Sequence, residues 1–338
     1  MTSGGSAVDA PPLVTLDAIR AAAETLRGVA SRTPLIPFGD PARRRYMKAE
    51  SLQPIGAFKI RGAYVAVASL SAADRARGVI TYSSGNHAQG VARAARLLGV
   101  AAVVVMPSDS PAIKRDRVAA DGAEIIMVGT ASDERQRVAE AIAAERGLAI
   151  IPPFDDDRII AGQGTIALEL LDDLPDLDCV LVPIGGGGLA SGIATAIKAL
   201  RPAAQVIGVE SELAADAQES LRRGEIVRWP AELVSRTIAD GTRTQALGTR
   251  TFAHLRAYLD AIVTVTEAEI AGAVRLAAER TRLVVEPSGA LSLAAMAFHQ
   301  HELGLGSLRG PVVAVISGGN VDPDRYRDLL GSPIPAEG

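Results

Sequence analysis

One lysine of this sequence lies in a setting that can turn its side chain into a nucleophile. Lys59 stands between two apolar residues, Phe58 and Ile60, and the turn-forming residues Pro54 and Gly56 precede it. Apolar neighbours remove water from an amine and lower its pKa, the condition under which lysine forms a Schiff base with a carbonyl compound. Most lysines are solvated surface groups, so Lys59 becomes a strong candidate only if other loops bring suitable partners to it.

A cluster of small polar residues follows a predicted strand at residues 79–82. Residues 83–90 read Ser-Ser-Gly-Asn-His-Ala-Gln-Gly and stand at the predicted start of a helix. Unsatisfied N–H groups and the macrodipole make such a helix start favourable for carboxylates or phosphates. The same residues can instead do no more than cap the helix, with Ser83 or Ser84 as the N-cap. From the residues alone, both interpretations stand.

Four consecutive glycines, at positions 185–188, follow another predicted strand. Consecutive glycines expose backbone N–H groups and let the chain curl around phosphate oxygens, which predicts a nest for a single phosphate. The loop also fits a dinucleotide fingerprint, because Gly185, Gly187 and Ala190 have the required spacing and Glu210 lies 20 residues beyond Ala190. A helix start without any ligand is the third interpretation.

The last predicted strand, at residues 312–316, ends in Ser317-Gly318-Gly319-Asn320. A hydroxyl at this place can face a ring nitrogen, although a capped turn is the commoner use of such residues. In open parallel sheets, ligands bind outside the carboxyl ends of the strands. The three loops are therefore the expected places for chemistry.

The elements that position these loops alternate between strand and helix. Short β-branched runs predict strands at residues 79–82, 101–106, 124–128, 148–151, 180–183, 205–209, 261–265 and 312–316. Helical spacing of apolar residues predicts helices at residues 16–31, 62–70, 87–98, 112–121, 133–146, 162–171, 189–200, 267–280 and 288–300. Residues 212–248 are more irregular and are predicted to wrap a surface. This alternation predicts an α/β fold with mostly parallel sheets covered on both faces.

Composition restricts the class of protein. A chain of 338 residues with 48% hydrophobic and 22% charged residues is typical of a globular enzyme of about two domains. The formal net charge of −4 and the scattered arginines argue against nucleic-acid binding and favour small-molecule partners. The single cysteine, Cys179, excludes an internal disulfide and a cysteine metal cluster, and we expect it in the core.

No membrane or secretory segment is expected. Residues 1–12 lack a basic region followed by an apolar one. The longest apolar candidate, residues 179–200, is interrupted by Pro183 and by the glycines, and it does not form the unbroken run of roughly 20 apolar residues that a membrane helix needs. We therefore expect a cytoplasmic protein without membrane partners.

Seven segments of the sequence stand out in order along the chain: residues 48–63, 83–90, 160–165, 185–188, 237–241, 286–287 and 317–320. Together and in this order they resemble those of the threonine dehydratase and serine racemase family of pyridoxal-phosphate-dependent enzymes. The resemblance spans residues 16–326 and favours a cofactor phosphate as the ligand of the glycine loop.

The resemblance implies a role for Lys59, which would hold the cofactor aldehyde as a Schiff base beside Phe58. Asn86 would hydrogen-bond the ring hydroxyl, and Ser317 would meet the pyridine nitrogen. A neutral hydroxyl does not keep a proton on the ring, so the ring would be a weaker electron sink and would favour prompt loss of a β-substituent. The cofactor site it implies consists of Phe58, Lys59, Asn86, Gly185, Gly186, Gly187, Gly188, Leu189, Gly241, Glu286 and Ser317.

The substrate site that the resemblance implies consists of Ser83, Ser84, Asn86, His87 and Arg135. The loop from Ser83 to His87 would bind the substrate carboxylate, and freed Lys59 would remove the α-proton. Ser84 matches a position that acts on the opposite face of the α-carbon, where a proton delivered by Ser84 would cause racemisation. Arg135 would favour an acidic or small polar substrate, unless it is a solvated helix residue.

Two positions depart from the family pattern. Ala57 stands where the family usually has serine or threonine, which removes a hydroxyl near the substrate and leaves the substrate preference open. Pro152 stands where a histidine is common.

The activity that the resemblance implies is elimination of water and ammonia from a 3-hydroxy amino acid such as threonine or serine, giving a 2-oxo acid. Serine racemisation and 3-hydroxyaspartate dehydration are the near alternatives, and the lysine and asparagine loops disfavour β-replacement. From other classes, an NAD-dependent dehydrogenase built on Gly185, Gly187, Ala190 and Glu210 and a non-catalytic amino-acid sensor stay open. Because the sequence ends soon after the last segment, we expect no inhibition by isoleucine.

The resemblance also implies an architecture and a metal site. The fold would be fold type II, like that of tryptophan synthase β, with two lobes, each a mostly parallel twisted sheet flanked by helices. A large cofactor-binding domain would comprise residues 13–50 and 152–330 and a small domain residues 51–151, with flexible tails at 1–12 and 331–338. Glu210, the Ala214 carbonyl and Asp216 match a divalent-cation site of the serine-racemase type, suited to Mg²⁺ or Ca²⁺, although surface acids are the alternative. A homodimer is usual in the family.

Overall fold

The structure, a computed structural model, describes residues 12–83, 85–108, 110, 112–129 and 132–336. The strands are β1 (Leu35–Pro37), β2 (Arg45–Ala49), β3 (Val79–Tyr82), β4 (Ala102–Pro107), β5 (Glu124–Val128), β6 (Ala149–Ile150), β7 (Cys179–Pro183), β8 (Gln205–Ser211), β9 (Ala261–Val265) and β10 (Val312–Ile316). The helices are α1 (Leu16–Thr25), α2 (Ile60–Ala68), α3 (Ala72–Arg77), α4 (Asn86–Leu98), α5 (Ala112–Ala120), α6 (Ser132–Arg146), α7 (Asp157–Asp173), α8 (Gly188–Leu200), α9 (Asp216–Arg223), α10 (Ala231–Val234), α11 (Thr249–Tyr258), α12 (Glu267–Thr281), α13 (Pro287–Phe298) and α14 (Pro323–Leu330).

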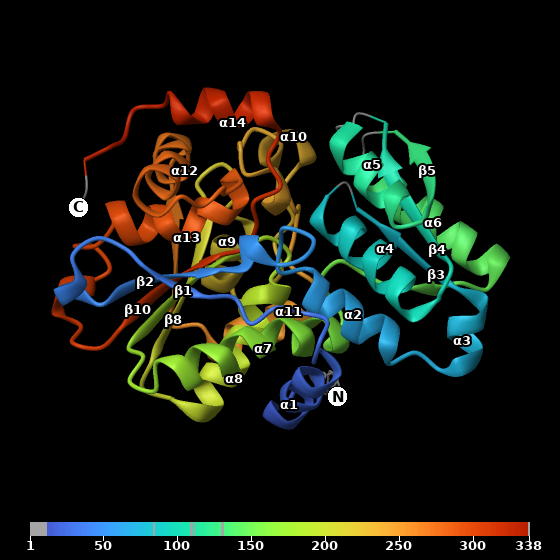
Figure 1. Ribbon diagram of the computed structural model, residues 1–338, viewed down its shortest axis with the longest axis horizontal. Coiled ribbons are helices and arrows are strands. Elements are labelled where there is room, and N and C mark those ends of the chain that lie inside the picture. The colour runs from blue at the N-terminus through green and yellow to red at the C-terminus, as the bar shows by residue number, and fades with distance from the viewer. Residues whose placement is uncertain (1–11, 84, 109, 111, 130–131, 337–338) are drawn as a thin grey trace, which may run out of the picture.

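The strands form two separate sheets (Figure 1). Six strands make one sheet in the order β1-β2-β10-β7-β8-β9, and four make the other in the order β5-β4-β3-β6. Within the described residues β1 and β2 pair in antiparallel fashion, and the other paired strands are parallel. The predicted α/β fold with two mostly parallel sheets is confirmed, whereas the residue limits of the two domains stay a prediction.

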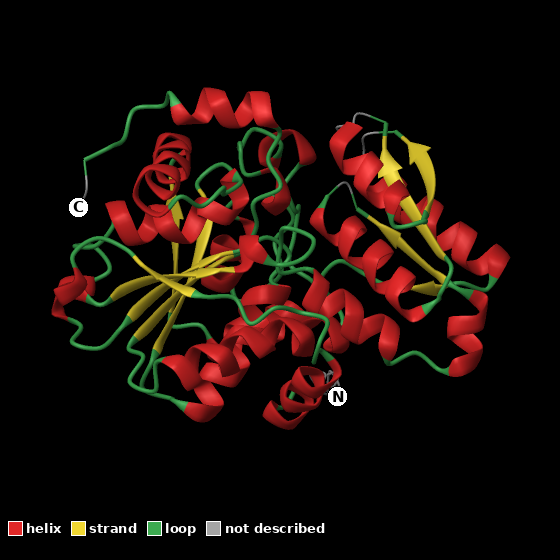
Figure 2. Ribbon diagram, in the orientation of Figure 1, coloured by secondary structure: helices red, strands yellow, loops and turns green. Residues whose placement is uncertain are grey.

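Helices cover both faces of the six-stranded sheet (Figure 2). All residues of β7 and β10 are buried, as expected for parallel strands packed on both sides. Alternate residues face alternate cores: Val180 and Val182 of β7 join the core with α7 and α8, and Leu181 joins the core with α12 and α13. Cys179 is buried at the start of β7, as predicted.

Three helices, α2, α7 and α8, pack closely against one another through glycines. A Cβ on Gly162 of α7 would lie 2.6 Å from the Cα of Gly62 in α2, and one on Gly164 would lie 2.8 Å from the carbonyl oxygen of Gly192 in α8. Real Cβ atoms do not come so close to backbone. Gly162 and Gly164 therefore serve helix packing, and this packing fixes α2, which begins directly after Lys59.

Most predicted elements are present, but their limits differ in instructive ways. The predicted helix at 162–171 begins at Asp157, because Asp156 caps it by accepting from the Arg158 N–H and because the close packing tolerates its glycines. The irregular segment 212–248 contains α9 and α10. No helix in the described part of the chain is long and apolar enough to cross a membrane.

Candidate active site

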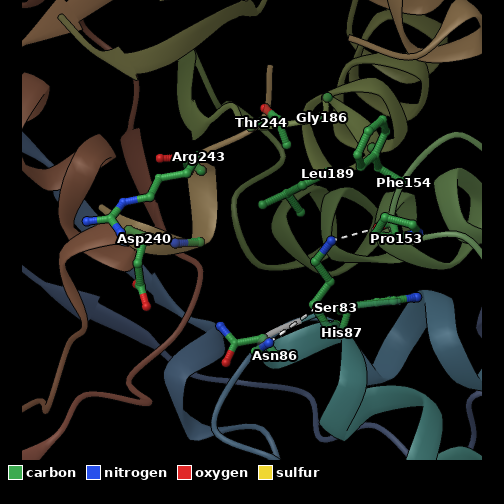
Figure 3. A pocket seen from close by; sticks show the side chains of 18 of the residues that line it. Ser83, Asn86, His87, Pro153, Phe154, Gly186, Leu189, Asp240, Arg243 and Thr244 are labelled. Carbon is green, nitrogen blue, oxygen red and sulfur yellow. Dashed lines mark hydrogen bonds between the residues drawn. The ribbon is translucent and has the colours of Figure 1, made fainter. Parts of the chain in front are cut away.

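A cavity of about 250 Å³ lies where the carboxyl ends of strands from both sheets meet. Ser83 follows β3, the glycine loop follows β7 and Ser317 follows β10, and all three loops line this cavity. The close-up in Figure 3 shows Pro153, Phe154, Gly186 and Leu189 along one side and Asp240 and Arg243 along another. The sequence rule that ligands bind at the carboxyl ends of parallel strands thus led to the right place.

Lys59 reaches into this cavity and its amine is engaged by the backbone. Its Nζ donates a hydrogen bond to the Pro153 carbonyl oxygen at 2.7 Å and lies 5.1 Å from the centre of the Phe58 ring. Burial lowers the pKa of Lys59 to about 8. At slightly alkaline pH a substantial fraction of the amine is thus unprotonated and able to attack a carbonyl carbon.

A buried ionic network fixes the start of α2 just beyond Lys59. Arg61 donates to both carboxylate oxygens of Glu50 at 2.8 Å and to Glu169 at 2.6 Å. Lys48 donates to the same Glu169 at 2.5 Å. Because a buried charge is costly without its partner, this network holds the backbone of Lys59 in one place.

The glycine loop has the form of an anion cradle. Gly187 has φ +91, a conformation that favours glycine, and it stands at the N-cap of α8 without a side-chain cap. A Cβ on Gly186 would overlap the Phe154 ring, and one on Gly187 would lie 3.0 Å from both Leu247 and Thr251. A phosphate can accept hydrogen bonds from the uncapped N–H groups at the start of α8.

Asn86 and Glu286 meet on the opposite side of the cavity. The Asn86 Nδ2 donates to Glu286 Oε1 at 2.6 Å, and the Asn86 Oδ1 accepts from Asn320 Nδ2 at 2.8 Å. Burial, reinforced by Asp240, raises the pKa of Glu286 to about 8. Asn86 is thereby held in a single orientation at the cavity wall.

Ser317 and Gly241 complete the wall. Ser317 is buried, its Oγ lies 3.4 Å from the Ser288 carbonyl oxygen, and its own carbonyl accepts from the Phe58 N–H at 3.0 Å. The Gly241 N–H donates to the Ser288 Oγ at 2.7 Å. The end of β10 is thereby tied directly to the segment that carries Lys59.

Comparison with known proteins shows the family. Residues 26–318 match the family described as "Pyridoxal-phosphate dependent enzyme". The chain belongs to this family. It is 46% identical to the L-threo-3-hydroxyaspartate ammonia-lyase of Saccharomyces cerevisiae over 84% of this chain and 85% of that protein. It is 42% identical to the L-threonine ammonia-lyase of Thermotoga maritima over 96% and 80% of the two chains. Among solved structures, maize serine racemase has a TM-score of 0.88 at 34% identity, covering 94% of this chain and 97% of that one.

The cavity fits pyridoxal phosphate. An uncharged fraction of Lys59 is available for the aldehyde, the glycine cradle and the open start of α8 suit the phosphate, and the Ser317 hydroxyl suits the ring nitrogen. The structure argues against the dehydrogenase alternative, which needs the Glu210 carboxylate to bind a ribose. Glu210 is only 1% exposed, and its oxygens already accept from the Ala217 and Gln218 N–H groups.

Most of the predicted site residues line the cavity of this pyridoxal-phosphate-dependent enzyme. They are Phe58, Lys59, Ser83, Asn86, His87, Arg135, Gly185, Gly186, Gly187, Gly188, Leu189, Gly241, Glu286 and Ser317. Ser84, predicted to act on the α-carbon, lies outside the described residues. The roles of these residues stay predictions.

His87 is a buried, neutral member of this set. Its Nε2 lies 3.1 Å from the Ile151 carbonyl oxygen, which is consistent with an N–H there. Burial, together with nearby Lys59, lowers the pKa of His87 to about 3. We therefore expect any contact of this side chain with substrate to come from a neutral imidazole.

Pro153, Phe154 and Lys114 are among the cavity residues that sequence reasoning missed. Pro153 and Phe154 follow β6 and contact Lys59 and the glycine loop, so the strand-end rule that found the other loops would have found them as well. Lys114 of α5 donates to Asp240 at 2.7 Å, and this ion pair joins two distant segments of the chain at the cavity. Lys114 gave no signal, because a lysine on a polar helix is ordinary.

The predicted metal ligands lie together away from the cavity lining. Asp216 is buried, and both of its carboxylate oxygens are without a hydrogen-bond partner among the described residues. Burial raises the pKa of Asp216 to about 7, and burial together with repulsion from Asp216 raises the pKa of Glu210. No group of three or more His, Cys, Asp or Glu side chains in the described ranges is arranged to hold a metal. A cation here would need backbone and water oxygens as further ligands.

Proposed function

We propose that the protein is an ammonia-lyase that converts a 3-hydroxy amino acid into a 2-oxo acid and ammonia. The observation that carries the proposal is the Lys59 amine, with its lowered pKa, in a cavity bounded by the glycine cradle and Ser317. The substrate loses its α-proton and its β-hydroxyl as water, and addition of water to the resulting enamine in its imine form releases ammonia. The net change is loss of ammonia alone, because one water leaves and one is added.

The residues divide this work among them. Pyridoxal phosphate, when bound, supplies the electron-withdrawing ring that makes the α-proton of an amino acid acidic. Lys59 takes that proton, since it is the amine with a lowered pKa in the cavity. The loop that begins at Ser83, with the N–H groups at the start of α4, holds the substrate carboxylate. The Ser317 hydroxyl, which lines the cavity, would meet the ring nitrogen and, being neutral, would not hold a proton on it.

The substrate preference rests on Arg135 and Ala57. Arg135, from α6, lines the cavity and can pair with a second carboxylate, which supports 3-hydroxyaspartate alongside threonine and serine. Relatives named hydroxyaspartate ammonia-lyase, threonine ammonia-lyase and serine racemase support the same range. Ala57 is fully buried and contributes no hydroxyl. Serine racemisation is the second candidate, and its expected proton donor is Ser84.

The test is a panel of amino acids of both configurations, including threonine, serine and 3-hydroxyaspartate. We expect 2-oxo acid and ammonia from at least one L-3-hydroxy amino acid and no product from alanine, which has no β-leaving group. Inverted serine without oxo acid would favour the racemase. No product from any member, in protein saturated with pyridoxal phosphate, would contradict the proposal.

We propose that Glu210, the Ala214 carbonyl and Asp216 bind a divalent cation. Support comes from the two unpartnered oxygens of Asp216 and the raised pKa values of both acids. Without metal, the folded acids hold protons that the unfolded acids release, so stability should fall as pH rises toward and through about 7 for Asp216. Ca²⁺ or Mg²⁺ should remove this fall and raise the melting temperature, and Asp216→Asn should abolish the metal response. An equal response in wild type and variant would contradict the site.

Two further properties belong to the proposal. The resemblance to the family supports a homodimer, which analytical ultracentrifugation tests. A cytoplasmic location is supported by the single cysteine of the sequence, which is buried and unpaired. A fluorescent fusion tests this location.

A further inference from the structure

Residues 151–156 join β6 to α7, and three consecutive aspartates, Asp155 to Asp157, lie at the end of this connection and have different partners. Asp156 caps α7, accepting from the Arg158 N–H at 2.8 Å. Asp157 pairs with the Arg250 side chain at the surface. Asp155 is half-buried and turns toward the start of α11, a helix whose N-cap residue, Gly248, provides no side-chain oxygen. The segment is therefore tied down by side chains at each of three successive positions.

Asp155 provides the cap that α11 lacks. One carboxylate oxygen accepts from the N–H groups of Arg250 at 2.9 Å and Thr251 at 3.1 Å, and the other accepts from Thr249 at 3.1 Å. A helix start leaves four N–H groups without helical partners, so Asp155 satisfies most of them at once. A negative charge at this end of the helix is favourable as well.

The segment that Asp155 holds carries two groups of the active site. The Pro153 carbonyl, two residues earlier, is the hydrogen-bond acceptor for the Lys59 amine at 2.7 Å. The Phe154 ring lies so close to Gly186 that no side chain fits there, and its backbone lies 3.1 Å from the Cβ position of Gly188. Phe154 is the only residue between Pro153 and Asp155, so a displacement of Asp155 moves the Phe154 ring and the Pro153 carbonyl with it.

The helix that Asp155 caps touches the same glycine loop from another direction. The Cβ position of Gly187 lies 3.0 Å from Thr251, and the Thr251 carbonyl accepts weakly from Ser191 of α8 at 3.4 Å. The Asp155 carboxylate thus joins two structures that enclose the glycine loop, the Phe154 ring and the first turn of α11.

We propose that Asp155 is a positioning residue for the reaction: by capping α11, it holds the Pro153 carbonyl against the Lys59 amine and the Phe154 ring against the glycine loop. The inference rests on the proposed function, because it needs Lys59 to be the lysine that reacts with the cofactor. Asp155 touches neither reacting atoms nor, in this account, substrate.

The experiment measures imine formation, seen as visible absorbance, in the full-length chain freed of cofactor. Two probes are added, pyridoxal phosphate and pyridoxal, since pyridoxal lacks the phosphate and reports on the amine alone. The variants are Asp155→Ala and Asp155→Asn. Asp322→Ala is the matched control, because Asp322 caps α14 by accepting from the Asp324 and Arg325 N–H groups.

We expect Asp155→Ala to slow imine formation with both probes and to raise the half-saturating pyridoxal phosphate concentration, each by roughly threefold to thirtyfold, the range that loss of an N-cap implies. Asp155→Asn should be slowed less than Asp155→Ala, because asparagine keeps one oxygen to accept from the Arg250 and Thr251 N–H groups but loses the acceptor for Thr249. Asp322→Ala should match wild type. If Asp155→Ala does not fold, Asp155→Ser, which keeps one capping oxygen, replaces it, and we expect at least a twofold slowing.

If the wild type forms the imine, and Asp155→Ala forms it as fast and with the same cofactor affinity as Asp322→Ala, the inference is overturned. The proposed function then stays intact. Slowing with pyridoxal phosphate but not with pyridoxal would overturn the role toward Lys59. Absence of imine in wild type would instead contradict the proposed function itself.

Discussion

The Lys59 amine differs from a surface lysine in its surroundings. Its pKa is lowered to about 8 by burial, its Nζ is bound to the Pro153 carbonyl, and the Phe58 ring stands beside it. Burial of an amine usually lowers the stability of the folded protein. Here the same burial lowers the pKa of the amine and makes it a nucleophile. At the scale of single residues, the site therefore consists of a desolvated amine held by one hydrogen-bond acceptor, the Pro153 carbonyl.

The clearest test at the residue scale is Gly186→Ala. Its Cβ would overlap the Phe154 ring, so either the ring or the glycine loop must move. We expect pyridoxal phosphate affinity to fall by about 1–3 kcal/mol, the usual cost of overpacking, with a smaller change in melting temperature. Equilibrium titration of the cofactor measures this. Gly306→Ala is the control, since nothing lies within 4 Å of its Cβ position, and equal affinities in the two variants would contradict the assignment of the loop.

At the scale of elements, three helices stacked through glycines carry the site. The glycines of the matched segment 160–165 serve packing, since Gly162 meets Gly62 of α2 and Gly164 meets Gly192 of α8. The sequence predicted strands β3, β5, β9 and β10 at their observed limits, because short β-branched runs end at turn residues. It placed the start of α7 five residues late, since a close helix contact that favours glycine cannot be seen from local spacing.

Gly164→Ala tests the helix stack. Its Cβ would lie 2.8 Å from the Gly192 carbonyl oxygen and from Ile19, both held in packed elements. We expect a loss of about 1–3 kcal/mol in the free energy of unfolding, measured by urea denaturation. Gly306→Ala again gives the baseline for an open position. A Gly164→Ala protein as stable as that control would show that the helices can separate without cost.

His299 gives α12 and α13 a pH-dependent connection. Its Nδ1 lies 2.7 Å from Glu302 and its Nε2 lies 3.1 Å from Glu269. Partial burial opposes the charge, but the hydrogen bonds to the two carboxylates prevail and raise the pKa of His299. A raised pKa means that the stabilisation is fully present below the unfolded pKa of about 6.5 and is lost as pH rises through the folded value.

The matched variant is His299→Gln, which cannot be charged. Between about pH 6 and pH 8.5, wild type should lose about 0.5–1 kcal/mol of unfolding free energy that the variant does not lose, consistent with a partly exposed pair. Urea denaturation at several pH values measures the difference. Parallel pH profiles for the two proteins would show that His299 does not cause the loss of unfolding free energy.

At the scale of the whole molecule, the site exists because parallel strands of two sheets present their carboxyl ends to one cavity. Ser83 follows a strand of the four-stranded sheet, and Ser317 follows a strand of the six-stranded one. Sequence patterns identified each loop, and the family resemblance predicted that they meet. What neither predicted was the contribution of the connecting segment with Pro153 and Phe154 or the bridge from Lys114 to Asp240. Such contacts depend on the relative placement of distant elements, which local patterns do not contain.

The most direct test of the central claim is to locate the cofactor on the chain. Protein saturated with pyridoxal phosphate is reduced with borohydride, digested and analysed by mass spectrometry. We expect loss of the visible absorbance and a reduced cofactor adduct on the peptide that contains Lys59. Lys59→Ala should form no adduct and no 2-oxo acid, whereas Lys198→Ala, whose amine bonds Asp260 away from the cavity, should behave like wild type. An adduct on another lysine, or an active Lys59→Ala protein, would contradict the account.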